Sequence, residues 1–169
     1  PTWSPDGRHL VFTSYLRGTP ALYLLTPAEG YLKLLWDKGG VNSSASFSPD
    51  GKKIAFASSV EGNVDIWVIP AEGGEGRRLT TAKAIDTQPT WAPNGRQIAF
   101  TSARSGSPQI YQMDADGTNV RRLTFGGGFH DEATFSEDGM RIVCTTKVGA
   151  VFQIATIDII NVRRTVIPG

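Results

Sequence analysis

The chain has 169 residues, of which 40% are hydrophobic and 20% are charged, and its formal net charge is +1. This composition is typical of a globular protein, and the apolar runs are too short to span a bilayer. The near-neutral charge gives no support for a nucleic-acid partner or for membrane insertion. The single cysteine, Cys144, excludes an internal disulfide.

A four-residue turn motif recurs every 44 residues. Its copies are Ser4-Pro5-Asp6-Gly7, Ser48-Pro49-Asp50-Gly51, Ala92-Pro93-Asn94-Gly95 and Ser136-Glu137-Asp138-Gly139. Proline presets φ, Asp or Asn caps the turn, and Gly accepts a positive φ, so we expect a structural turn and not a ligand site. The register divides the chain into one partial domain of repeat units 1–44, 45–88, 89–132 and 133–169. The chain begins in mid-repeat, as expected for a piece of a longer protein.

Each unit predicts four strands. In the second unit we expect them at about 42–47, 52–58, 64–69 and 76–81, because the middle segments alternate β-branched and aromatic residues. Gly73-Gly74 and Asp116-Gly117 mark outer hairpins. Four antiparallel strands per unit, at a period in the forties, predict an all-β fold of four consecutive four-stranded β-propeller blades.

Large apolar residues recur at fixed places in the unit. One residue before the turn motif stand Trp3, Phe47, Trp91 and Phe135. Because a blade packs both faces against neighbours, we expect all four side chains to be buried between blades. Cys144 takes the place that Phe holds in the other units, which favours core packing over a reactive thiol.

Motifs of catalysis and metal binding are missing from the sequence. It contains no G-x-S-x-G elbow, no H-E-x-x-H and no Cys/His cluster at metal-ligand spacing. We therefore predict no enzyme activity, no catalytic residue, no metal and no cofactor. His9 is interpreted as a solvated strand residue, and the Arg pairs at 77–78, 121–122 and 163–164 as outer-edge residues that discourage strand addition.

One set of positions differs between units where the scaffold positions repeat. It comprises the segments just before each inner strand: Val41-Asn42-Ser43-Ser44, Ile85-Asp86-Thr87-Gln88 and Phe129-His130-Asp131-Glu132. Loops held on a rigid scaffold at one mouth of a propeller channel usually form the binding site for a ligand or a partner protein. We therefore predict a partner-binding surface here, and loop variation without a function is the alternative. Its predicted residues are Val41, Asn42, Ser43, Ser44, Ile85, Asp86, Thr87, Phe129, His130 and Asp131. Asp86, His130 and Asp131 could also hold a cation, although one carboxylate per loop makes a poor calcium cage.

The segments Ala84–Ser102, Ser107–Gly117 and Val120–Gly127 resemble the propeller of the TolB family of the Tol-Pal envelope system. The resemblance covers essentially the whole chain and implies four successive blades of a six-bladed propeller. It also implies a periplasmic protein whose propeller binds the peptidoglycan-associated lipoprotein Pal. By this resemblance Val41, Ser44 and Thr87 match positions that touch Pal. Only Thr87 keeps the expected residue type, since Val41 stands where a His is usual.

Two other functions stay open at this point. The turn motif also occurs in gating propellers of tricorn and prolyl-oligopeptidase peptidases, and a sugar- or ion-binding propeller is the third alternative. Four blades at a wedge angle of about 60° span only about 240° and leave two blade faces bare. We expect Leu10 and Phe12 on one bare face, and Ile142 and Ile154 on the other. An open arc that forms homo-oligomers through these faces is therefore predicted.

Overall fold

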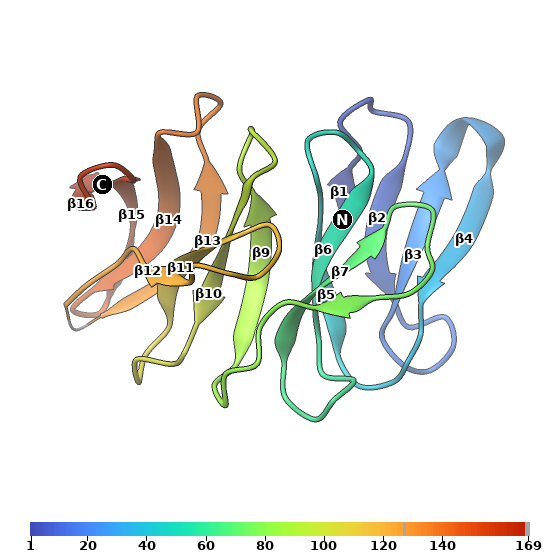
Figure 1. Cartoon of the computed structure of the whole chain (residues 1–169), viewed down its shortest axis with the longest axis horizontal. Coiled ribbons are helices and arrows are strands. Elements are labelled where there is room, and N and C mark those ends of the chain that lie inside the picture. The colour runs from blue at the N-terminus through green and yellow to red at the C-terminus, as the bar shows by residue number, and fades with distance from the viewer. Residues whose placement is uncertain (127, 168–169) are drawn as a thin grey trace.

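The computed structural model describes residues 1–126 and 128–167, which form sixteen strands in four antiparallel sheets (Figure 1). Each sheet follows chain order from its inner to its outer strand. The first sheet holds β1 (Thr2–Trp3), β2 (Leu10–Ser14), β3 (Ala21–Thr26) and β4 (Tyr31–Trp36), and the second β5 (Asn42–Phe47), β6 (Lys53–Ser58), β7 (Asp65–Pro70) and β8 (Arg77–Arg78). The third holds β9 (Asp86–Trp91), β10 (Gln97–Ser102), β11 (Gln109–Asp114) and β12 (Arg121–Arg122), and the fourth β13 (Phe129–Phe135), β14 (Arg141–Val148), β15 (Val151–Asp158) and β16 (Arg163–Ile167).

This arrangement confirms the predicted all-β fold of four consecutive four-stranded blades. The inner strands β5, β9 and β13 run across the unit boundaries drawn from the sequence, so each blade begins a few residues earlier than its repeat unit. The Arg pairs lie on the outermost strands, as predicted. The one helical element in the described part of the chain is a 3-10 turn, Pro27–Glu29, in the first outer hairpin.

The repeated turn after each inner strand is capped by its own side chains. The Asp50 carboxylate accepts hydrogen bonds from the Lys52 backbone N–H at 3.0 Å and from the Ser48 hydroxyl at 2.6 Å. Asp6 and Asp138 repeat both bonds, and Asn94 repeats the backbone one. These bonds hold the pKa of Asp6, Asp50 and Asp138 below the ordinary value. The predicted role of these residues as turn caps is therefore confirmed.

Three hydrophobic clusters hold the blades together, one at each boundary between neighbouring blades. Phe47 and Trp91 are buried in the first and second clusters, Phe135 packs half-buried against the third, and Cys144 is buried there. Trp3 is 55% exposed, so the prediction that all four residues of this position are buried is wrong for Trp3. The physical reason is that, within residues 1–126 and 128–167, no other blade packs against that side of the first blade.

The blades form an open arc whose first and fourth members lie at opposite ends of the long axis (Figure 1). Strand register places Leu10, Phe12 and Leu34 on the outward face of the first blade, and Val143, Ile154 and Ile167 on that of the fourth. Ile142 was expected on the second bare face but is fully buried, because successive residues of a strand alternate sides and Ile142 packs toward the third blade.

A buried ion pair lies near the boundary of the second and third blades. The fully buried Asp65 accepts a 2.6 Å hydrogen bond from Arg78, which also pairs with Glu61 at 2.6 Å. Burial raises the pKa of Asp65, and the negative Asp86 raises it further, while Arg78 acts in the opposite direction. The net result is that ionised Asp65 weakens folding compared with its protonated form.

The two tryptophans before the turn motif provide a matched test of packing between blades. Trp91 is 7% exposed and contributes to the second cluster, whereas Trp3 is 55% exposed. We expect Trp91→Ala to lower the free energy of unfolding by about 3–5 kcal/mol, as for other buried aromatics. Trp3→Ala should cost less than about 1 kcal/mol, measured by urea unfolding of a monomeric sample. Equal costs for the two variants would contradict the assigned packing.

Asp65 and Asp50 should respond to pH with opposite signs. The raised pKa of Asp65 means that its stabilising contribution is full below the unfolded-state pKa of about 3.9 and is lost as pH rises through the folded pKa. The stability of Asp65→Asn relative to the parent should therefore increase as pH rises from about 4 to 7, when the ionic strength is held constant. The pKa of Asp50 is lowered, so its stabilising contribution is full above the unfolded-state pKa of about 3.9 and is lost as pH falls through the folded pKa. The stability of Asp50→Asn relative to the parent should therefore stay about constant from pH 7 to about pH 5 and increase as pH falls further towards about 2. Chemical denaturation from about pH 2 to 7 measures both variants, and a shared sign of the two pH dependences would refute the Asp65 environment.

Candidate functional site

The inner strands begin at one end of the arc with three equivalent buried residues. Asn42, Asp86 and His130 are each 0% exposed. The Asn42 amide donates to the Pro20 carbonyl at 2.9 Å, and the backbone N–H groups of Asp86 and His130 donate to the carbonyls of the equivalent residues Val64 and Pro108. These residues tie each blade to the hairpin of the preceding one. The prediction that their side chains contact a partner is therefore corrected, because a partner's surface cannot reach them.

The remaining predicted residues do reach the surface. Val41 and Ile85 are 46% and 51% exposed, and Ser44 is also exposed. Ser43, Thr87, Phe129 and Asp131 are half-buried. The structure thus brings seven of the ten predicted residues to the outside of the same end of the arc.

The inner strands β5, β9 and β13 are each interrupted by a β-bulge at the same repeat position. In the second blade the register shifts between Ser43 and Ser46. In the third blade it shifts where β9 pairs with Ala99 to Thr101 of β10, and in the fourth between Asp131 and Thr134. Within the bulges Ser44, Gln88 and Glu132 have left-handed φ values of 55°, 52° and 56°. A non-glycine residue in this conformation costs about 1 kcal/mol or more. The repeated bulge turns these three side chains away from the regular pleat.

The bulges of three blades converge on one shallow hollow of about 350 Å³. Ser44, Gln88 and Glu132 line it together with hydroxyl groups of Thr2, Thr90 and Thr134. A chain of hydrogen bonds fixes its third-to-fourth-blade side. The Thr101 hydroxyl lies 2.7 Å from Asp131 Oδ1 and 3.2 Å from Gln88 Oε1, and the Glu132 backbone N–H points to the same two oxygens. The hollow is therefore a polar surface with fixed acceptors.

Exposed apolar residues lie at the end of the arc where the inner strands begin. The hairpins that join the second and third strands of each blade lie at the same end, since Ser59 N–H donates to the Val41 carbonyl and Ala103 N–H to the Ile85 carbonyl. The equivalent hairpin of the first blade exposes Tyr15 and Leu16, each 69% accessible. We call this surface the bulge face, and it comprises the hollow together with Tyr15, Leu16, Val41 and Ile85. Exposed apolar residues at the same end as a polar hollow can bury area against a protein partner.

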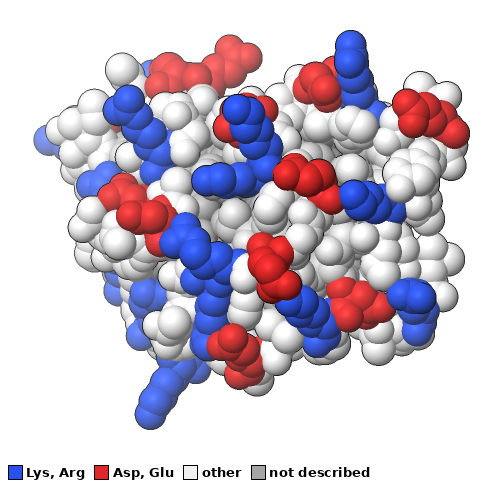
Figure 2. Space-filling view, turned by 45° about the vertical axis from the view of Figure 1, so that its right-hand side comes forward, with Lys and Arg blue, Asp and Glu red and all other residues white. Residues whose placement is uncertain are grey.

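The distribution of charged and metal-ligating side chains bears on which kinds of ligand the surface can bind. On the face shown in Figure 2, basic and acidic side chains are interspersed and do not form a field of one sign. Within residues 1–126 and 128–167, no three His, Cys, Asp or Glu side chains are arranged to hold a metal ion. One oxygen of Asp86 is already held by Arg104 at 2.7 Å. The same residues contain no helix with the length and apolar character needed to cross a bilayer.

Sequence reasoning missed Tyr15 and Leu16, in a hairpin of the bulge face. It placed Gln88 and Glu132 in the variable segments but left them out of the predicted contact residues. The signal for Gln88 and Glu132 was their shared repeat position with Ser44, but none of the three is a glycine that would mark a left-handed backbone. The signal for Tyr15 and Leu16 was two large apolar residues next to a turn glycine, Gly18.

Comparison with known proteins shows strong similarity to one family. A crystal structure of TolB from Acinetobacter baumannii matches with a TM-score of 0.89 and 34% identity, over 97% of this chain and 41% of that one. A TolB structure from Agrobacterium tumefaciens matches with a TM-score of 0.89 and 25% identity, over 97% of this chain and 62% of that one. The Tol-Pal system protein TolB of Francisella tularensis subsp. mediasiatica is 43% identical over 47 residues, which are 28% of this chain and 11% of the relative.

Peptidase propellers are more distant. Dipeptidyl peptidases and a puromycin hydrolase match at 14% to 19% identity, which shows a shared fold and nothing further. The family profile described as the TolB β-propeller domain matches residues 1–167, almost the full length of the chain. This chain therefore belongs to the TolB β-propeller domain family.

Proposed function

We propose that this propeller is a non-catalytic binding platform of the Tol-Pal system, and that its bulge face binds the globular domain of Pal. The observation that carries the proposal is the bulge face itself. Three blades each place a left-handed residue at the same hollow, and exposed apolar residues lie at the end of the arc where these strands begin. Backbone strain that recurs at one surface, on a rigid scaffold, favours a binding role over loop variation.

Membership of the TolB family supports the choice of partner. The curated relative is a Tol-Pal system protein. The half-buried Thr87 and the exposed Ser44 and Val41 match the positions that the resemblance assigns to Pal contact. The chain spans 41% of the Acinetobacter protein, so the partner of the whole protein is part of the proposal. A periplasmic location follows from the same reasoning.

A gating propeller of a serine peptidase is the alternative. The distant peptidase matches show that peptidase propellers share this fold. The similarity to TolB structures is higher in both TM-score and sequence identity. A hydrolase domain encoded beside this propeller would favour the peptidase, whereas an upstream α/β domain with a signal peptide would favour the Tol-Pal function.

The Pal proposal can be tested at Ile85 and Thr87, which lie beside the hollow. Ile85→Glu combined with Thr87→Arg places charge in the centre of the proposed interface. We expect the dissociation constant for Pal from the same genome to rise about tenfold or more, because interface centres carry most of the energy. Isothermal titration calorimetry measures this change. Asp86 is left intact because a charge reversal there would disrupt a buried ion pair.

The control variant carries the same kinds of change at the opposite end of the arc. Ile160→Glu with Met140→Arg alters two residues that are 74% and 55% exposed near the turn motif of the fourth blade. This variant should bind Pal as the parent does. Unchanged Pal affinity in the folded Ile85/Thr87 variant, or no measurable binding by the parent chain, would refute the proposal.

We also propose that residues 1–169, prepared alone, self-associate through the bare faces of the first and fourth blades. Leu32 and Leu34 on β4 and Ile154 and Ile167 on β15 and β16 are 36% to 47% exposed, and large apolar patches rarely stay uncovered in water. The two faces differ, so pairing one with the other is head-to-tail.

Sedimentation velocity over a range of concentrations tests this second proposal. We expect concentration-dependent oligomers in the parent chain. Leu32→Lys with Ile154→Lys should shift them to monomers, because each change puts an ammonium group on a bare face. Ile160→Lys, an exposed change outside both faces, should leave them unchanged. A parent chain that stays monomeric throughout would contradict the proposal.

A further inference from the structure

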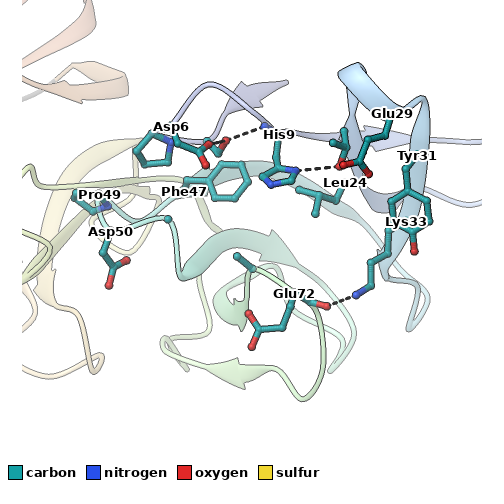
Figure 3. A pocket seen from close by; sticks show the side chains of 15 residues that line it. Asp6, His9, Leu24, Glu29, Tyr31, Lys33, Phe47, Pro49, Asp50 and Glu72 are labelled. Atoms are coloured by element: carbon teal, nitrogen blue, oxygen red, sulfur yellow. Dashed lines mark hydrogen bonds between the residues drawn. The ribbon is translucent and has the colours of Figure 1, made fainter.

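A second cavity lies at the other end of the arc, in the cleft between the first and second blades (Figure 3). Its volume is about 750 Å³, within the range of ligand-binding clefts. The turn motifs of both blades and the first outer hairpin border it. Because inner strands end at the turn motif and begin at the bulge face, this cleft is separate from the proposed Pal surface.

The cleft is larger than the equivalent spaces at the other two boundaries. At the second boundary that space is about 390 Å³ and is lined by Trp91, which occupies the repeat position of Phe47. At the third boundary it is about 380 Å³ although a phenylalanine, Phe135, holds the same repeat position, so the size of the ring does not explain the difference. The first outer hairpin carries the 3-10 turn and the six-residue strand β4, whereas the second has Gly73, Gly74 and Gly76 followed by a two-residue strand. Residues of this longer hairpin supply one wall.

The wall and floor of the cleft differ in chemistry. Phe47, Leu24 and Ala71 form an apolar floor between the two blades. His9 and Tyr31 stand at its edge (Figure 3), and His9 Nδ1 is fixed by the Thr26 hydroxyl at 3.0 Å. His9, expected to be simply solvated, is thus half-buried in a cavity wall. An aromatic and aliphatic floor next to polar groups suits a ligand with an apolar stem and a polar end.

The border of the cleft is rich in carboxylates. It carries the side chains of Asp6, Glu29, Asp50 and Glu72, against one ammonium group, that of Lys33. Asp6 and Asp50 are ionised at neutral pH, and their turn hydrogen bonds hold their pKa below the ordinary value. The Lys33 ammonium, which donates a 2.6 Å hydrogen bond to the Glu72 backbone carbonyl, offsets only one of these four negative charges. The excess of carboxylates favours a cationic ligand.

We propose that this cleft binds a basic side chain, arginine or lysine, carried by a peptide segment of a protein partner. The methylene groups of such a side chain pack on Phe47 and Leu24, as long charged side chains do on apolar surfaces. The cationic end lies among Glu29, Glu72 and Asp6. The Tyr31 ring, 54% exposed, can add a cation–π contact. The flanking residues of the peptide lie along the open border.

The test uses a blocked peptide, acetyl-Gly-Leu-Arg-Leu-Gly-amide, and the same peptide with citrulline in place of arginine. Citrulline keeps the shape of arginine and removes its charge. We expect the arginine peptide to bind the full chain with a dissociation constant of about 1 mM or tighter, and the citrulline peptide about tenfold more weakly. Titration followed by backbone and side-chain NMR measures both affinities and should shift the His9 and Tyr31 signals.

Two independent variants locate the site. Phe47→Trp copies the residue of the next blade into the floor and should reduce peptide affinity about tenfold by filling the cleft. Glu29→Gln with Glu72→Gln keeps the shape, removes two charges, and should reduce affinity by a similar factor of about ten. Glu137→Gln, on the turn of the fourth blade, is the matched control and should have no effect. All four proteins should bind Pal equally, because the bulge face is unchanged.

Three results would overturn the proposal. The first is no detectable binding of the arginine peptide at a concentration of about 10 mM, which is about tenfold above the expected dissociation constant. The second is equal binding of the citrulline peptide, which would mean that the carboxylates do not recognise charge. The third is unchanged affinity in the Glu29/Glu72 variant, which would place the peptide elsewhere even if Phe47→Trp disturbed folding.

Discussion

The structure depends on one packing constraint, the burial of both faces of each four-stranded sheet against a neighbour. Each of the three hydrophobic clusters combines residues from two consecutive blades, so no blade has a core of its own. The repeat period of the sequence and the common positions of its aromatic residues both follow from this constraint. So do the two apolar end faces, since a blade at either end of the arc meets the requirement on one side only.

Polar ties within the arc meet a second requirement, which is that buried polar groups have partners. The turn motif satisfies its own backbone through Asp or Asn, and this local solution repeats almost unchanged along the chain. The side-chain bonds at the start of each inner strand do not repeat. The Asn42 amide donates to the Pro20 carbonyl of the preceding blade and accepts from Ser58 of its own blade, while its equivalent Asp86 pairs with Arg104 of its own blade. Variation at these positions reflects alternative ways to satisfy one buried site.

The sequence predicted the fold well because blade packing is periodic. The strands of the second unit, the turn caps and the burial of Cys144 all follow from position in the repeat. Exposure did not follow, because it depends on which neighbours exist: Trp3 and Trp91 share a repeat position and differ in burial. The sequence predicted where the candidate surface lies, but not which of its side chains reach the outside. Variable polar residues suggested contact at Asn42, Asp86 and His130, yet these side chains are inside. The bulges carry no glycine signal, so Gln88 and Glu132 were left out of the predicted contact residues.

The two ends of the arc differ in how far they depart from the repeat. At the bulge face three blades repeat the same strained backbone, so that surface is a property of the repeat and extends over several blades. At the turn end the cleft is enlarged at one boundary, where the longer first outer hairpin supplies one wall. A feature shared by all blades suits a broad interface with a globular partner. A departure confined to one boundary suits a short segment held in a single cleft. The rigid sheets between the ends allow the two surfaces to vary independently, since a change in a turn-end hairpin does not alter the register of the inner strands.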